Sequence, residues 1–159
     1  MSFPERIYTV EEVKKAKELT DKGYKHRLRV KGSPDFKKKA KQALALVKTA
    51  GYYSFLRTYI RNITEIDGLT QLREAEAAIW ANKYALENPV DAASLFIQKA
   101  NHMKEYIEGK LYYGGTAEKR SVEKRIKFLE RLKNRSKTKE IVEECERLLK
   151  FWSESSLVY

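Results

Sequence analysis

The side chains with the types and spacing for metal chemistry lie between Ser94 and Glu118. Gln98 and His102 are four positions apart, so both lie on one face of a helix. When His occupies both positions and Glu follows the first, the two imidazoles bind Zn²⁺ and the carboxylate acts as a general base. Here the three positions hold a neutral amide, the ammonium of Lys99 and one imidazole. An ammonium cannot take a proton from water, so the spacing of a zinc site is present without most of its chemistry.

Two predicted helices position these side chains. The first begins at Asn88-Pro89, which combine a capping side chain with a proline in the first turn, and ends at Gly109. Its buried face is predicted from apolar residues at helical spacing, namely Ala93, Phe96, Ile97, Ala100 and Ile107. After a loop from Leu111 to Gly115, Thr116 begins the second helix. That helix carries Glu118 and the apolar row Val122, Ile126, Leu129 and Leu132.

The segment from Asp91 to Lys133 resembles a group of small bacterial zincin-like metallopeptidase domains. Those domains contain an apolar segment, the motif His-Glu-x-x-His, a connection rich in Tyr and Gly, and a Glu-bearing helix that ends in F-L-x-R-L. The matching letters here are S-L-F-I-Q-K-A-N-H, then Y-Y-G-G at residues 112–115, then F-L-E-R-L. Because the lead-in from Val30 to Phe36 is also similar, the resemblance covers residues 24 to 135.

The resemblance implies a role for each position of the site. Gln98 replaces the first His ligand, Lys99 replaces the catalytic Glu, and His102 retains the second His. Glu118 matches the downstream acidic ligand, with Glu123 as the second choice. Because a catalytic zinc site has three protein ligands, the resemblance implies a degenerate site with no catalytic residue, no metal and no cofactor. An ion pair of Lys99 with Glu118 would then replace the metal bridge, and the domain would serve a protein-interaction or regulatory role with an unidentified partner.

The charge of the chain is uneven. Residues 1–50 carry 14 Lys/Arg against 6 Asp/Glu, residues 51–100 carry 5 against 6, and residues 101–159 carry 14 against 10. These counts give +8, −1 and +4, which sum to the net charge of +11. The nearly neutral middle third contains Gln98 and Lys99 of the degenerate site, whereas the first third favours binding to a polyanion.

A second hypothesis follows from the pattern of residues 24–41. Apolar residues alternate with Lys25, Arg27, Arg29 and Lys31, which predicts a half-buried strand near residues 24–30 with one cationic face. Ser33 and Pro34 then begin a helix that adds further cations, Lys37, Lys38, Lys39 and Lys41. This density is typical of binding to the phosphate backbone of nucleic acid without reading bases, although a solvated lysine-rich surface has the same composition. No helix-turn-helix, zinc finger or RNA-binding sheet signature accompanies it.

The whole chain is predicted to fold as one α+β domain, residues 1–159, that is predominantly α-helical with a small β component. Further helices are predicted over residues 9–21, 52–64 and 138–152. The segment from Gln71 to Leu86 favours helix by its Ala and Glu content, but a strand through Ala78–Ala81 fits as an alternative. Cys145, the only cysteine, lies in an apolar row and is expected to be a buried hydrophobe. With no membrane-spanning run and no secretory signal near residue 1, the chain is expected to be cytoplasmic.

Overall fold

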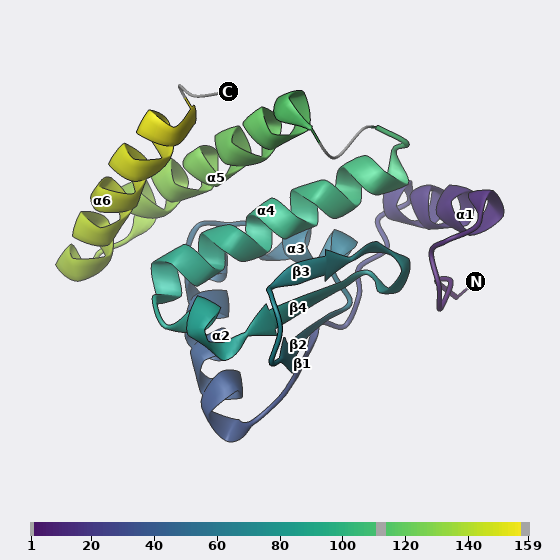
Figure 1. Cartoon of the computed structure of the whole chain (residues 1–159), viewed down its shortest axis with the longest axis horizontal. Helices are drawn as coiled ribbons and strands as arrows, with labels where there is room; N and C mark the ends of the chain where they lie inside the picture. Colours follow the sequence, from purple (N-terminus) through teal and green to yellow (C-terminus); the bar gives the residue numbers. More distant parts are fainter. Residues whose placement is uncertain (1, 111–113, 157–159) are drawn as a thin grey trace.

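A computed structural model describes residues 2–110 and 114–156. Its α-helices and strands confirm an α+β, mainly helical fold (Figure 1). In chain order they are α1 (Val10–Asp21), β1 (Arg29–Lys31), α2 (Pro34–Thr49), α3 (Tyr53–Tyr59), β2 (Asn62–Ile66), β3 (Gln71–Arg73), β4 (Ala78–Asn82), α4 (Pro89–Ile107), α5 (Gly115–Arg135) and α6 (Lys139–Ser156). Two short 3₁₀ helices, Glu74–Glu76 and Lys83–Leu86, flank β4.

The four strands form one sheet in the order β1-β2-β4-β3. β1, β2 and β4 are parallel, and β3 is an antiparallel edge strand. The register aligns Val30, Ile63, Ile79 and Leu72 in one row across the sheet, and all four pack into the core. This face is apolar because alternate residues of a strand point to opposite sides.

The opposite face of the sheet is polar. The next row contains Lys31, Thr64, Trp80 and Gln71, and their side chains are exposed or partly exposed. In Figure 1, α4 lies above the sheet, α3 behind it and α2 to its left, and no helix of the described chain is drawn in front of it.

α4 is the central helix of the fold. It packs against α2, α3 and α5 and also contacts α1, α6 and β3. Its buried side chains include Phe96 and Ile97, which join Phe36 of α2 and Phe128 of α5 in the core. α5 and α6 run side by side on the outer side of α4 (Figure 1), and Cys145 of α6 is fully buried, as predicted.

The helix starts follow the capping signals of the sequence. The Thr9 hydroxyl accepts from the backbone of Glu12, whose carboxylate accepts from the backbone of Thr9, and together they form a capping box. Ser33 caps α2 ahead of Pro34, and the Asn88 side chain caps α4. These three predicted starts are confirmed.

The predicted strand at residues 24–30 is shorter than expected and begins only at Arg29. The backbone amide of His26 donates to the carbonyl of Arg57 at the end of α3 instead of to a neighbouring strand. The alternation of burial still holds, since His26 is buried whereas Lys25 and Arg27 are exposed.

Two helix predictions were wrong in the middle of the chain. The helix expected to reach residue 64 ends at Tyr59, and Asn62–Ile66 instead forms β2. The helix expected over Gln71–Leu86 is replaced by β3 and β4, as the alternative strand through Ala78 suggested. Pairing of β2 with both β1 and β4 outweighs the local helix preference of these Ala- and Glu-rich residues.

Candidate functional site

Gln98 lies buried at the contact between α4 and α5. Its side chain is 8% exposed, and its Nε2 donates to the Ser121 hydroxyl at 3.2 Å. Its Oε1 accepts from Nη1 of Arg125 at 2.7 Å. The amide is thus held by two side chains of α5.

Arg125 joins α5 to α4. Its Nε donates to the Ser94 hydroxyl at 2.9 Å, and its Nη2 donates to Asp91 Oδ1 at 2.7 Å. The guanidinium also lies 4.3 Å from the ring centroid of Trp152 on α6. Burial lowers the pKa of Arg125, and the nearby Asp91 carboxylate opposes that shift.

Sequence reasoning missed Arg125, which is one of many cations on α5. A signal existed, because Asp91, Ser94 and Gln98 are spaced by three and four positions and so share one helical face. A polar stripe at that spacing on a largely apolar helix requires a polar partner on the facing element.

Lys99, His102 and Glu118 lie close enough for their charges to interact. Burial lowers the pKa of Lys99, as does Arg125, whereas Glu118 raises it. Burial also lowers the pKa of His102, and Lys99 adds to that effect while Glu118 opposes it. The buried Nε2 of His102 has no hydrogen-bond partner among the described residues.

The ion pair expected between Lys99 and Glu118 is not formed within 4.0 Å in the described part of the chain. The cation that contacts Gln98 is Arg125. Glu123, the second choice for the acidic position, is exposed, whereas Glu118 is partly buried. Within residues 2–110 and 114–156, no three His, Cys, Asp or Glu side chains are grouped in a way that could hold a metal ion.

The cations of residues 25–41 occupy β1, the residues before it and the first half of α2. All seven that carry the nucleic-acid hypothesis are exposed, and none pairs with a carboxylate in the described structure: Lys25, Arg27, Arg29, Lys31, Lys37, Lys38 and Lys41. We call these seven the β1–α2 cationic surface. Lys39 differs, because its Nζ lies 3.0 Å from Asp35 and 2.5 Å from Glu87.

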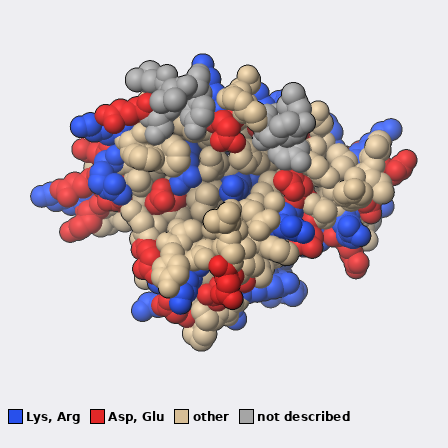
Figure 2. Space-filling model, viewed as in Figure 1, with Lys and Arg blue, Asp and Glu red and all other residues tan. Residues whose placement is uncertain are grey.

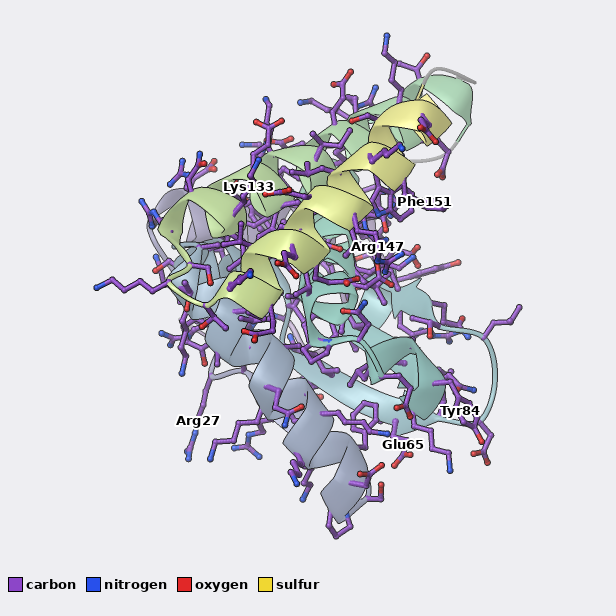
Figure 3. The ribbon with its side chains drawn as sticks, turned by 90° about the vertical axis from the view of Figure 1, so that its left-hand side faces the viewer. Arg27, Glu65, Tyr84, Lys133, Arg147 and Phe151 are labelled. Carbon is purple, nitrogen blue, oxygen red and sulfur yellow. The ribbon has the colours of Figure 1, made fainter. Side chains whose placement is uncertain are left out.

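The figures show how charged side chains lie on two sides of the molecule. On the face in Figure 2, basic and acidic side chains are intermixed, so that face is not uniformly positive. Figure 3 shows Arg27 projecting from the molecule on the side away from Glu65 and Tyr84. On the polar face of the sheet, the Arg73 guanidinium lies 4.4 Å from the ring centroid of Trp80, in the row that also contains Lys31.

The remaining candidate groups are buried in apolar surroundings. Burial raises the pKa of the Cys145 thiol to about 11. His26 contacts the rings of Phe3 and Tyr24, and burial together with Arg61 and Arg57 lowers its pKa to about 4. Neither group is a nucleophile or a base near neutral pH.

Adjacent tyrosines occur twice in the chain, at residues 52–53 and 112–113. Tyr52 packs edge-on against Phe55 and Phe128, at the edge of the core. Tyr112 and Tyr113, with most of the predicted loop at 111–115, lie outside the described residues.

No helix in the described part of the chain is both long and apolar enough to cross a bilayer. No family model, curated protein or solved structure matches this chain.

Proposed function

We propose that this protein is a non-catalytic domain that binds the phosphate backbone of nucleic acid through the β1–α2 cationic surface. The supporting observation is that all seven cations are exposed and free of carboxylate partners among the described residues. Such cations are available to displace the counterions that surround phosphates, and this release of counterions drives sequence-independent binding.

The environment of Gln98 supports a non-catalytic role. Its amide is engaged by Ser121 and Arg125, and Lys99 follows it directly. The cation Lys99 therefore lies at the position of the general base, and a second cation, Arg125, is bonded to the amide at the first ligand position. Their charge opposes the entry of a metal cation.

The test is binding of fluorescently labelled 20-nucleotide DNA and RNA, single- and double-stranded, to the full chain. Arg27→Glu, Arg29→Glu and Lys38→Glu together should abolish binding at 100 mM salt. A matched control changes three exposed lysines elsewhere, Lys14, Lys137 and Lys150, to Glu. Both triple variants lower the net charge from +11 by 6 to +5. Equal loss in the two variants would mean that net charge, not this surface, causes binding, and would overturn the proposal.

A second candidate is a zincin-like domain that has lost its metal site and binds a protein partner. The observation that favours it is the placement of Gln98 and His102 on α4 near Glu118 of α5, with electrostatic coupling of Glu118 to both Lys99 and His102. These are the positions that the metallopeptidase resemblance assigns to the ligands and the base.

Restoring the motif tests this candidate. Gln98→His with Lys99→Glu, combined with Arg125→Leu to remove the neighbouring guanidinium, should take up one zinc ion per chain, measured by elemental analysis. The control is Lys104→Glu with Arg125→Leu, which makes the same charge change one turn further along α4. Failure of the restored variant to bind zinc while still folded, as judged by circular dichroism, would exclude the zincin-like geometry.

A further inference from the structure

A hollow of about 270 Å³ lies between the second half of α4 and the first half of α5. Five cations line it: Lys104, Lys110, Arg120, Lys124 and Lys127. Two carboxylates, Glu105 and Glu123, also line it, so its net charge is five minus two, or +3.

The cations of α5 form a continuous stripe. Arg120, Lys124, Lys127 and Arg131 are spaced by four, three and four positions, which places them on one helical face over about 16 Å. A second hollow of about 240 Å³ continues along this stripe. It shares Lys127 with the first hollow and adds one cation, one carboxylate and two neutral side chains: Arg131, Glu130, Tyr52 and Asn134.

Internal carboxylates neutralise only part of this charge. Arg120 pairs with Glu105 at 2.5 Å, and Lys104 and Lys110 share Glu108 at 3.2 and 3.3 Å. Lys124 and Lys127 pair with no carboxylate among the residues that the structure describes. The centre of the stripe therefore carries uncompensated positive charge.

The Lys124 ammonium is held in place within this field. Its Nζ lies 4.4 Å from the ring centroid of Phe55 and 5.2 Å from that of Tyr52. Burial lowers the pKa of Lys124, and the neighbouring cations Lys104, Lys127 and Arg131 lower it further. A bound anion would offset this repulsion between cations. Part of the binding free energy of the anion would therefore come from relief of electrostatic repulsion that is present in the free protein.

We infer that the hollow between α4 and α5 binds the phosphoryl groups of a ligand that carries at least two of them. Each terminal phosphoryl group brings a charge of about −1.5 to −2 near neutral pH and each backbone phosphodiester brings about −1, so two terminal groups or about three backbone phosphates offset the +3 of the lining residues. Several ammonium groups and the guanidinium of Arg120 supply donors from different directions, which suits tetrahedral oxyanions. The phosphoryl groups belong either to a small molecule or to a nucleic-acid backbone.

The site is tested by isothermal titration calorimetry of the full chain with pyrophosphate at constant ionic strength, which measures the dissociation constant. Lys124→Gln with Lys127→Gln should weaken pyrophosphate binding at least tenfold. The control, Lys14→Gln with Lys150→Gln, removes the same charge from exposed positions on α1 and α6 and should leave binding unchanged. Since Lys127 is exposed, Lys127→Gln alone gives a variant that folds even if loss of Lys124 weakens packing against Phe55. Equal affinity of the hollow variant and its control, or no saturable binding, would overturn the inference.

The same variants separate the two sources of phosphate and keep this site distinct from the β1–α2 cationic surface. A small-molecule source predicts that the hollow variant loses pyrophosphate binding and retains oligonucleotide binding. A backbone source predicts that it loses both. The variant Arg27→Glu, Arg29→Glu, Lys38→Glu should retain pyrophosphate binding in either case. If it loses pyrophosphate binding to the same extent as the hollow variant, the anion is not held in the hollow and the inference fails.

Discussion

At the scale of single residues, Arg125 of α5 makes four hydrogen bonds to α4. It is 5% exposed and bonds to the side chains of Ser94, Gln98 and Asp91. Removal of the guanidinium leaves buried polar groups of α4 without a partner, and each such group costs about 1–3 kcal/mol.

We therefore expect Arg125→Met to lower the free energy of unfolding by about 2–4 kcal/mol, measured by urea denaturation. Lys119→Met, an exposed position on the same helix, should change it by less than about 0.5 kcal/mol. Arg125→Met with Gln98→Leu should recover part of the loss, because the second change removes an unpartnered amide. A loss below 1 kcal/mol for Arg125→Met would show that water satisfies these groups.

His26 gives the fold a dependence on pH. Its Nε2 is buried without a partner among the described residues, and its pKa in the folded chain is about 4 against an ordinary value of 6.5. Since the unfolded chain binds this proton more readily, the contribution of His26 to stability should be constant above about pH 6.5 and fall as the pH drops towards 4. The loss from this group approaches about 3 kcal/mol.

His26→Phe should reduce this decline, measured by urea unfolding at pH 7 and pH 4.5. A smaller decline of the same sign should remain in the variant, because burial lowers the pKa of His102 as well. If native protein and variant lose equal stability on acidification, other groups cause the effect and His26 does not.

At the scale of elements, the sheet brings Trp80 into the row that contains Lys31 and Thr64. A nucleic acid held by Arg29 and Lys31 at the edge of this sheet can reach the polar face. Stacking of a base on an aromatic ring there adds about 1–3 kcal/mol.

We expect single-stranded oligonucleotides to quench the fluorescence of Trp80 in the variant Trp152→Phe, which leaves Trp80 as the only tryptophan. The reciprocal variant, Trp80→Phe, retains Trp152 beside Arg125 and should show no quenching. Binding without quenching of Trp80 would confine the ligand to β1 and α2.

Local signals predicted the helix starts correctly but failed for the central strands. Thr9, Ser33 and Asn88 act on their own first turns, so the sequence is sufficient to find them. β2 depends instead on partners 33 positions away in β1 and 16 positions away in β4, whereas β3 pairs with β4 over five to nine positions and forms the edge of that sheet. For the candidate site, the sequence places Gln98 and His102 on one helix and Glu118 on the next, whereas Arg125, the partner of Gln98, is identified only when α4 and α5 are packed together.

At the scale of the whole molecule, the +11 charge has two concentrations that differ in kind. The β1–α2 cationic surface is exposed and without carboxylate partners in the described chain, whereas the hollow between α4 and α5 is concave and partly neutralised. An extended charged surface suits a long polyanion, and a charged concave site suits a compact anion.

The salt dependence of nucleic-acid binding should measure how many phosphates the β1–α2 cationic surface contacts. For duplex DNA, the logarithm of the association constant falls with the logarithm of salt concentration by about 0.9 per phosphate contact. Changing Arg27, Arg29 and Lys38 to Gln, which removes three cations without adding acids, should reduce this slope by about 2–3, measured by fluorescence anisotropy between 50 and 200 mM salt. An unchanged slope would mean that these three side chains do not contact phosphates.

The burial of Cys145 between α6 and the rest of the molecule makes its thiol a probe of helix opening. Cys145 is fully buried, it is the single thiol of the chain, and its pKa of about 11 leaves little thiolate at neutral pH. A thiol reagent can modify it only when α6 separates from the rest of the molecule. Under conditions where reclosing is faster than modification, the labelling rate gives the free energy of that opening. The kinetics of labelling at one native atom therefore measure how firmly the C-terminal helix is attached, without a single mutation.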